Sequence, residues 1–202
     1  MAAGHPFTIT DIDRWLYGVL SVDALMKSYA PGGFWAVDPD SVDNQNWSST
    51  YSYHFGDIAN GIDGQPYRSL INSNVGNEPS ASPSSWAYCF PCVRWWVQSP
   101  GRDTKRQDGQ AGRVMSNPFV MVCMLDRQRG GSIDLVGGSN GNLEAASLRL
   151  VTLLDARNEL VTLPGARTFQ FTAYQLSAYQ MVEPANGDFH VLVGHRYQLH
   201  IQ

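Results

Sequence analysis

The stretch that decides the fold is residues 53–86, which reads YHFGDIANGIDGQPYRSLINSNVGNEPSASPSSW. More than half of it is glycine, proline, asparagine, aspartate and serine, the residues that turns favour. Single aromatic residues, Tyr53, Tyr67 and Trp86, stand between the turn signals. Such a pattern predicts short strands joined by tight turns. We therefore expect a small all-β module in this part of the chain.

The spacing of glycines and aromatic residues resembles the small β-module best known from chitin-binding domains, which phage structural proteins also carry. The matching positions are Tyr53-x-x-Gly56-Asp57, Gly64-x-x-Tyr67, Gly76-x-x-Pro79 and Trp86. The resemblance implies that Tyr53, Tyr67 and Trp86 could bind glycan, because sugars stack on exposed rings. The alternative is that these rings fill the core of the module, since so small a domain has little else to fill it.

Composition limits the class of protein. The chain has 202 residues, enough for one large domain or two small ones. Its apolar fraction of 43% suffices for a core, and its charged fraction of 16% is low. The 19 glycines and 11 prolines favour turns and strands over long helices. The formal net charge of -4 argues against a nucleic-acid binder that acts through bulk charge.

Charge is distributed unevenly along the chain. Residues 1–63 carry eight aspartates against two basic residues, whereas residues 94–129 carry seven basic residues against three aspartates. A Gly-, Gln- and Arg-rich loop is predicted at 99–114. This asymmetry suits a protein that stacks on copies of itself, although a solvated loop explains it equally well. The candidate residues for an assembly interface are Arg102, Lys105, Arg106 and Arg113.

The remaining segments predict an α+β domain. Helical spacing of apolar residues covers two stretches within 8–29 and a longer helix over about 143–157. Strands are expected at 34–37, 118–125, 168–175, 179–182 and 189–201, with a further one around Ile133 and Leu135. We expect a small antiparallel or mixed sheet with a long helix and an N-terminal helix.

Joined together, residues 8–37 and 117–202 resemble the tail-terminator (tail-completion) proteins of long-tailed phages. The resemblance begins at Ile12-Asp13-Arg14-Trp15-Leu16-Tyr17 and continues through Gly33-Phe34-Trp35-Ala36. It resumes at Asn117-Pro118-Phe119-Val120 and Val136-Gly137-Gly138, and it ends at Gly194-His195-Arg196-Tyr197-Gln198-Leu199.

This resemblance implies a discontinuous domain formed by 1–37 and 117–202, with 38–116 as an inserted β-module. The strands at 34–37 and 118–125 would then be neighbours in one sheet, with the module as an excursion between them. The family forms a hexameric ring that caps the tail tube and later joins it to the head. The implied partners are further copies of the chain, the tail tube protein and head-completion or connector proteins. The expected location is the virion, after assembly in the host cytoplasm.

A second hypothesis is a carbohydrate-binding surface protein that acts through the inserted module. A third is a thiol-based metal or redox protein, because Cys89-Phe-Pro-Cys92 is a C-x-x-C motif and Cys123 could join it. The flanking residues do not fit a thioredoxin-like unit. His190, His195 and His200 do not converge, since their spacing places His195 on the opposite strand face. We predict no enzyme, no metal, no cofactor and no membrane span.

Overall fold

The computed structural model describes residues 9–36, 44–98, 118–128, 143–163, 167–185 and 188–201. Its α-helices are α1 (Ile9–Leu20), α2 (Ala24–Tyr29) and α3 (Leu143–Leu154), and a short 3-10 helix spans Pro79–Ala81. The strands are β1 (Phe34–Trp35), β2 (Ile58–Asn60), β3 (Pro66–Ser69), β4 (Trp86–Tyr88), β5 (Cys92–Gln98), β6 (Phe119–Gln128), β7 (Asn158–Leu163), β8 (Arg167–Ala185) and β9 (Asp188–Ile201).

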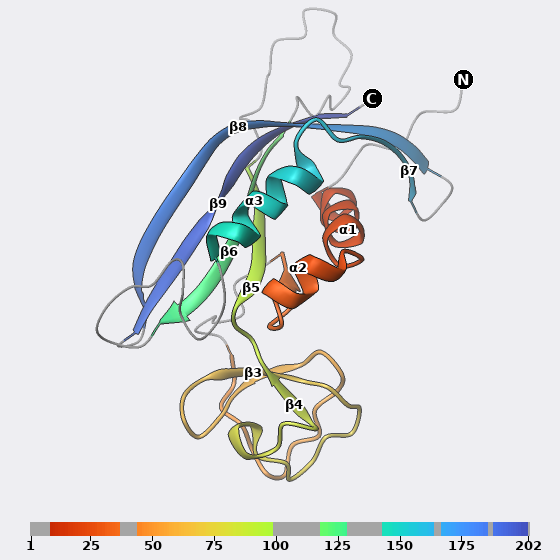
Figure 1. Cartoon of the computed structure of the whole chain (residues 1–202). Helices are drawn as coiled ribbons and strands as arrows, with labels where there is room; N and C mark the ends of the chain where they lie inside the picture. The colour runs from red at the N-terminus through yellow and green to blue at the C-terminus, as the bar shows by residue number, and fades with distance from the viewer. Residues whose placement is uncertain are drawn as a thin grey trace, which may run out of the picture.

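Six strands form one curled sheet in the order β1-β5-β6-β9-β8-β7 (Figure 1). β1 and β5 run parallel, whereas the other neighbours in this sheet are antiparallel. Its longest pairing joins β8 and β9 in an extended hairpin. The α+β class is confirmed, but the described chain is mostly β and the sheet is larger than expected.

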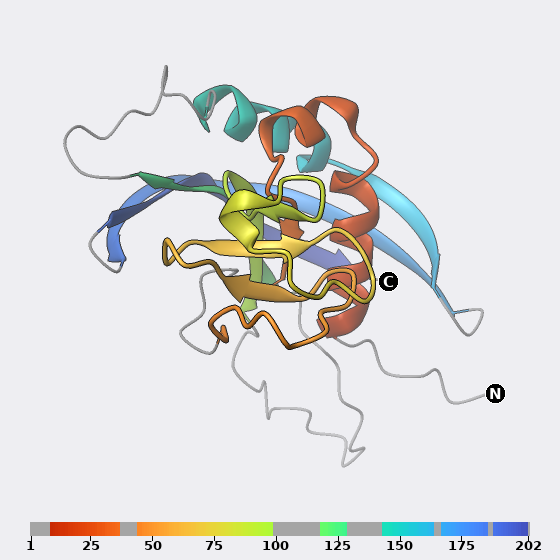
Figure 2. The same ribbon diagram turned by 90° about the horizontal axis from the view of Figure 1, so that it is seen from below.

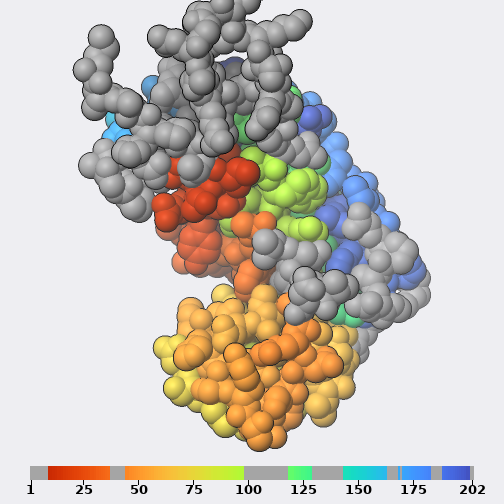
Figure 3. Space-filling view, turned by 180° about the vertical axis from the view of Figure 1, so that it is seen from behind, coloured from red at the N-terminus to blue at the C-terminus, as the bar shows by residue number. Residues whose placement is uncertain are grey.

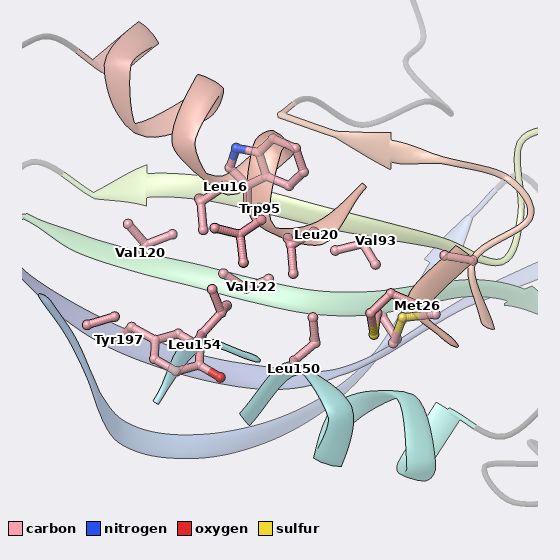
Figure 4. Close-up of a cluster of buried hydrophobic side chains, with 14 of the residues drawn as sticks. Leu16, Leu20, Met26, Val93, Trp95, Val120, Val122, Leu150, Leu154 and Tyr197 are labelled. Carbon is pink, nitrogen blue, oxygen red and sulfur yellow. The ribbon is translucent and has the colours of Figure 1, made fainter. Parts of the chain in front are cut away.

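The helices pack against one face of this sheet because alternate strand residues are apolar. In β6, for example, Val120, Val122 and Met124 are buried in the same cluster as the helix residues Leu16 and Leu150. Figure 4 shows Leu16 and Leu150 of the helices pointing toward Val120 and Val122 of β6. The main core therefore lies between the sheet and its helices.

Helix α1 joins strands from distant parts of the curled sheet. On β5, the Trp95 indole nitrogen donates to the Asp13 carboxylate at 2.9 Å. On β7, Glu159 accepts from the Trp15 indole nitrogen at 3.3 Å, and the Trp15 ring stacks on Phe171 of β8. The sheet consequently curves round α1, as the view from below shows (Figure 2).

The small module is a second, three-stranded antiparallel sheet in the order β2-β3-β4. It forms a lobe below the rest of the described chain (Figure 3). Its core consists of Tyr53, Ala59 and Trp86. A separate cluster around Cys89, Phe90 and Cys123 lies where the module meets the large sheet, because Ile58 and Tyr88 of the module pack against it.

One expectation about the topology is wrong. The strands predicted at 34–37 and 118–125 belong to the same sheet, but β5 lies between them. Residues 92–98, which the sequence suggested were part of the insert, thus pair with both β1 and β6. Parallel neighbours need a crossover of about a dozen residues or more. The small module lies within the crossover from β1 to β5, rather than in an excursion between β1 and β6.

Other element predictions differ at their boundaries. The strands expected at 168–175 and 179–182 are one strand, β8, which has a register shift between Gln175 and Ser177. The helix expected over 143–157 ends at Leu154, and β7 follows it where no strand was expected. The predicted loop at 99–114 and the predicted strand around Ile133 and Leu135 lie outside the described residues.

Candidate functional site

Two of the three rings proposed for glycan binding are buried. Tyr53 and Trp86 pack edge to face, with ring centroids 5.0 Å apart, in the core of the small module. The Tyr53 hydroxyl accepts from the Ser48 amide at 2.8 Å, and the Trp86 indole donates to the Asn77 carbonyl at 2.8 Å. A buried ring offers no face to a sugar, so these two residues serve the packing of the module.

The third ring, Tyr67, is half-buried. It lies 5.7 Å from the Tyr88 ring, and its hydroxyl donates to Asp63 at 3.0 Å. The proposed interface residues Arg102, Lys105, Arg106 and Arg113 lie outside the described part of the chain. Among the predicted site residues that the structure describes, Tyr53, Tyr67 and Trp86, none therefore joins another in an exposed binding surface.

A different surface stands out on the face of the large sheet opposite the helices. The strand register aligns three rows of side chains across β5, β6, β9 and β8. These rows are Phe119–Gln198–Tyr174, Trp96–Met121–Arg196–Ser177 and Arg94–Cys123–Gly194–Tyr179. We call this surface the aromatic–arginine face and define it by Arg94, Trp96, Phe119, Tyr174, Tyr179 and Arg196.

Arginines and rings alternate on this face. The Arg94 guanidinium lies 5.2 Å from the centre of the Trp96 ring, and Arg196 lies 4.1 Å from that of Phe119. Trp96 in turn contacts Tyr179 edge to face, with centroids 6.3 Å apart. Cation–π contacts of this kind orient the guanidinium groups. The two arginines are therefore held against neighbouring rings of the same chain.

The charge of this face comes from its arginines. None of the side chains in the three rows is a carboxylate. Burial, together with the neighbouring Cys123, raises the pKa of the Tyr179 phenol, so this group remains neutral. Tyr174 is 47% exposed, and most of the other defining residues are half-buried. The surface is thus cationic and aromatic, and Trp96 and Tyr179 on it also pack against the buried cysteine cluster.

Sequence reasoning missed this face, although the signal was present. The alternation that places His195, Tyr197 and Leu199 toward the helices also places Arg196 on the opposite side. The same argument separates Trp96 from Trp95 on β5. The alternation does not predict the strand register, and it is the register that brings residues of four strands into one surface.

A polar group of serine, histidine and glutamine is buried beneath α3. Ser147 Oγ lies 2.7 Å from His195 Nε2, and the Gln175 amide nitrogen lies 2.8 Å from His195 Nδ1. His195 Nε2 also lies 3.1 Å from the Ser147 carbonyl oxygen, which can only accept. Nε2 therefore carries the hydrogen and cannot take a proton from the Ser147 hydroxyl. The group joins α3 to the sheet.

The three cysteines, Cys89, Cys92 and Cys123, are reduced thiols buried in one cluster. Within the described ranges, no group of three or more histidine, cysteine, aspartate or glutamate residues is placed to hold a metal ion. In the same part of the chain, no helix is long and apolar enough to cross a membrane.

Comparison with known proteins adds no relative: no protein-family model, curated protein or solved structure significantly matches the chain. The interpretation of the aromatic–arginine face therefore depends on its own chemistry.

Proposed function

We propose that the protein is a structural component of a phage virion, a tail terminator or neck protein. It forms a ring that caps the tail tube and joins it to the head. Two segments, 8–37 and 117–202, support this proposal through their resemblance to the tail-completion family. The helices and strands described within these segments share one core with β5.

The observation that carries the proposal is the aromatic–arginine face. The cores of protein–protein interfaces are enriched in tyrosine, tryptophan, phenylalanine, methionine and arginine, and are depleted of lysine, aspartate and glutamate. Tryptophan, tyrosine and arginine also dominate the binding energy of such interfaces. The face has this composition over four neighbouring strands. A surface of this composition is typical of a protein that assembles with other protein subunits.

The partners proposed are further copies of the chain, which form a hexamer, together with the tail tube protein and head-completion or connector proteins. The test is a micrograph of the purified protein, alone and mixed with tails that lack a terminator. We expect rings, or density at the head-proximal end of the tails. The proposal would be contradicted if the protein remained monomeric and bound nowhere on the tails.

A second candidate is carbohydrate binding by the small module, and exposed aromatic rings favour it. Tyr51 is 49% exposed and Phe55 is 63% exposed, whereas Tyr53 between them is buried. Exposed rings are what sugar stacking requires. A pull-down with chitin and bacterial cell wall tests this function, with a Tyr51→Ala, Phe55→Ala double variant as the comparison. If the wild-type protein is not retained, the module does not bind these sugars.

A further inference from the structure

The outer edge of strand β8 is open along its second half. β7 pairs with β8 only over Arg167–Thr172, and Asp155 then accepts from the Gln175 amide at 2.9 Å. Beyond Gln175, no strand of the described ranges pairs with this edge. Figure 1 shows this part of β8 as the left-hand border of the large sheet, away from β7. An open edge leaves backbone N–H and C=O groups available to another strand.

Hydrogen bonds near the start of this edge show which way the backbone faces. The Ala173 amide donates to the Arg157 carbonyl at 3.1 Å, so it points away from β9. Leu199 is the β9 partner of Ala173, and its amide donates to the Pro118 carbonyl at 2.9 Å, on the side of β6. The two paired residues therefore point away from each other.

The same alternation identifies the outward-facing residues farther along β8. In an antiparallel pair, residues that point toward each other alternate with residues that point away from each other. Counting in twos along β9 from Leu199, past the register shift in β8, reaches residues whose β8 partners also face the open edge. These β8 residues are Ala178, Gln180 and Val182.

This edge lacks the features that block strand pairing in natural proteins, such as lysine and other charged residues. No charged residue occurs in Thr168–Val182. Interruptions stand only at its ends, as the register shift at one end and Pro184 at the other. Its apolar side chains Leu176, Met181 and Val182 are between 37% and 49% exposed. The edge therefore offers hydrogen bonds to a second strand without a charge to repel it.

We propose that the open edge of β8 binds the same edge of a second copy, antiparallel and about a two-fold axis at Gln180. In this register Ala178 lies opposite Val182 of the second copy, and Gln180 lies opposite its own counterpart. Each opposing pair exchanges both backbone hydrogen bonds, because all three residues face outward. A centre one residue later would set Ala178 opposite Pro184, which has no amide to donate.

Length and charge select a second copy as the occupant. At the other border of the large sheet, β1 has two residues, and the strands of the small module have three or four. These edges are too short to match the open part of β8, whereas β8 matches itself. In a two-fold contact, residues at the axis meet their own counterparts, so a charge there would face its like. The neutral run Thr168–Val182 avoids this repulsion.

The contact is isologous, because both copies contribute the same surface. It joins the large sheets of two copies into one continuous sheet. It pairs two copies and does not by itself close a ring, so the inference goes beyond the proposed function.

The test measures the dimerisation of full-length variants over a range of concentrations by sedimentation velocity. Gln180→Lys and Gln180→Glu each place like charges opposite one another at the axis. Each should therefore raise the dissociation constant of the dimer at least about tenfold. An equimolar mixture of the two variants should dimerise again, because opposite charges then meet. Thr162→Lys is the matched control at an exposed position of β7, and it should dimerise as the wild type does.

A cysteine at the axis tests the register. Opposite Cα atoms of a hydrogen-bonded antiparallel pair are about 5.5 Å apart, within the span of a disulfide. Gln180→Cys should form a covalent dimer on mild oxidation, whereas the wild type should not, because its three cysteines are buried. Leu160→Cys, at a 71% exposed position of β7, is the control and should not self-cross-link. Cross-linking of Gln180→Cys to Leu160→Cys alone would assign the edge to β7 of another copy and overturn the proposal.

Two further results would contradict the contact. One is a wild type that stays monomeric at every concentration, and the other is wild-type-like dimerisation of both Gln180→Lys and Gln180→Glu. Circular dichroism confirms that each variant is folded, as expected for changes at an exposed residue. The proposed function is tested separately. Rings on tails without a β8 dimer in solution would refute only the contact, and dimers that bind no tails would refute only the tail role.

Discussion

At the residue scale, neighbouring tyrosines take opposite roles. Tyr53 is buried against Trp86, whereas Tyr51, two positions earlier, is exposed. The orientation of Tyr53 is fixed by its bridge to Asn74 and by the Ser48 amide that donates to its hydroxyl. The sequence predicts that this module contains rings, but not which of them point inward. That choice depends on partners that are distant in the chain.

The burial of His195 leads to a prediction about how the stability of the fold depends on pH. Burial lowers the pKa of this imidazole, and the hydrogen bond to the Ser147 carbonyl opposes the effect only in part. The unfolded chain has the ordinary histidine pKa of about 6.5, so it takes up a proton before the folded chain does. The free energy of unfolding should therefore fall as the pH drops below about 6.5, and the titration of His195 should not change it above that pH.

The measurement is urea unfolding, followed by circular dichroism, from about pH 8 to about pH 5. His195→Gln is the comparison, because it removes the titrating group while the other histidines remain. The difference in unfolding free energy between wild type and variant should shrink toward low pH. A difference that does not change with pH would show that His195 is not held in its neutral form.

At the element scale, local patterns predict helices better than strand partners. The apolar spacing around Trp15 and Leu16 is enough to locate α1, because a helix satisfies its backbone within one segment. Strand β5 was assigned to the wrong sheet because a strand takes its hydrogen bonds from elsewhere in the chain. Its Trp95-Trp96 pair suits either sheet, and the pairing with Met121 and Val122 decides between them.

The short helix α2 depends on its N-cap. Asp23 Oδ1 accepts from the Met26 amide at 2.8 Å, and Oδ2 accepts from Arg149 of α3 at 2.6 Å. Asp23→Ala removes both bonds and should cost about 1–2 kcal/mol of unfolding free energy, the usual range for a lost cap. Asp23→Asn keeps a capping oxygen but loses the ion pair.

Chemical denaturation of the two variants separates these contributions. Because the ion pair is partly exposed, we expect Asp23→Asn to cost clearly less than Asp23→Ala. Equal losses would mean that the link between α2 and α3, rather than the cap, holds this helix in place.

At the scale of the whole molecule, the α+β class could be predicted from the sequence, but the topology could not. Alternation shows that Phe34–Trp35 and residues 118–125 suit strands, yet it does not say which strand lies beside which. The parallel neighbours β1 and β5 are separated by a long stretch of the chain. The aromatic–arginine face could not be predicted for the same reason. Its residues lie side by side only when four strands pair in this register.

The topology leads to a prediction about which part of the chain can be removed. Every residue of the main buried cluster comes from α1, α2, α3, the segment after α2, or strands β5, β6, β8 and β9. In the proposed variant, a Gly-Ser linker of about fifteen residues replaces 45–88. This linker is long enough for the crossover that a parallel pair requires. This variant should fold and unfold cooperatively. It should be less stable than the wild type, because Ile58 and Tyr88 no longer cover the cysteine cluster.

The matched comparison replaces 40–115, which also removes β5. That deletion takes Val93 and Trp95 out of the core and leaves β6 without a neighbour on one side. We expect it to be unfolded, since removing a large buried side chain alone costs about 3–5 kcal/mol. Thermal unfolding followed by circular dichroism distinguishes the two. If the 45–88 replacement is also unfolded, the small module is part of the folding unit of the large sheet, and the chain is one domain rather than a core with an added lobe.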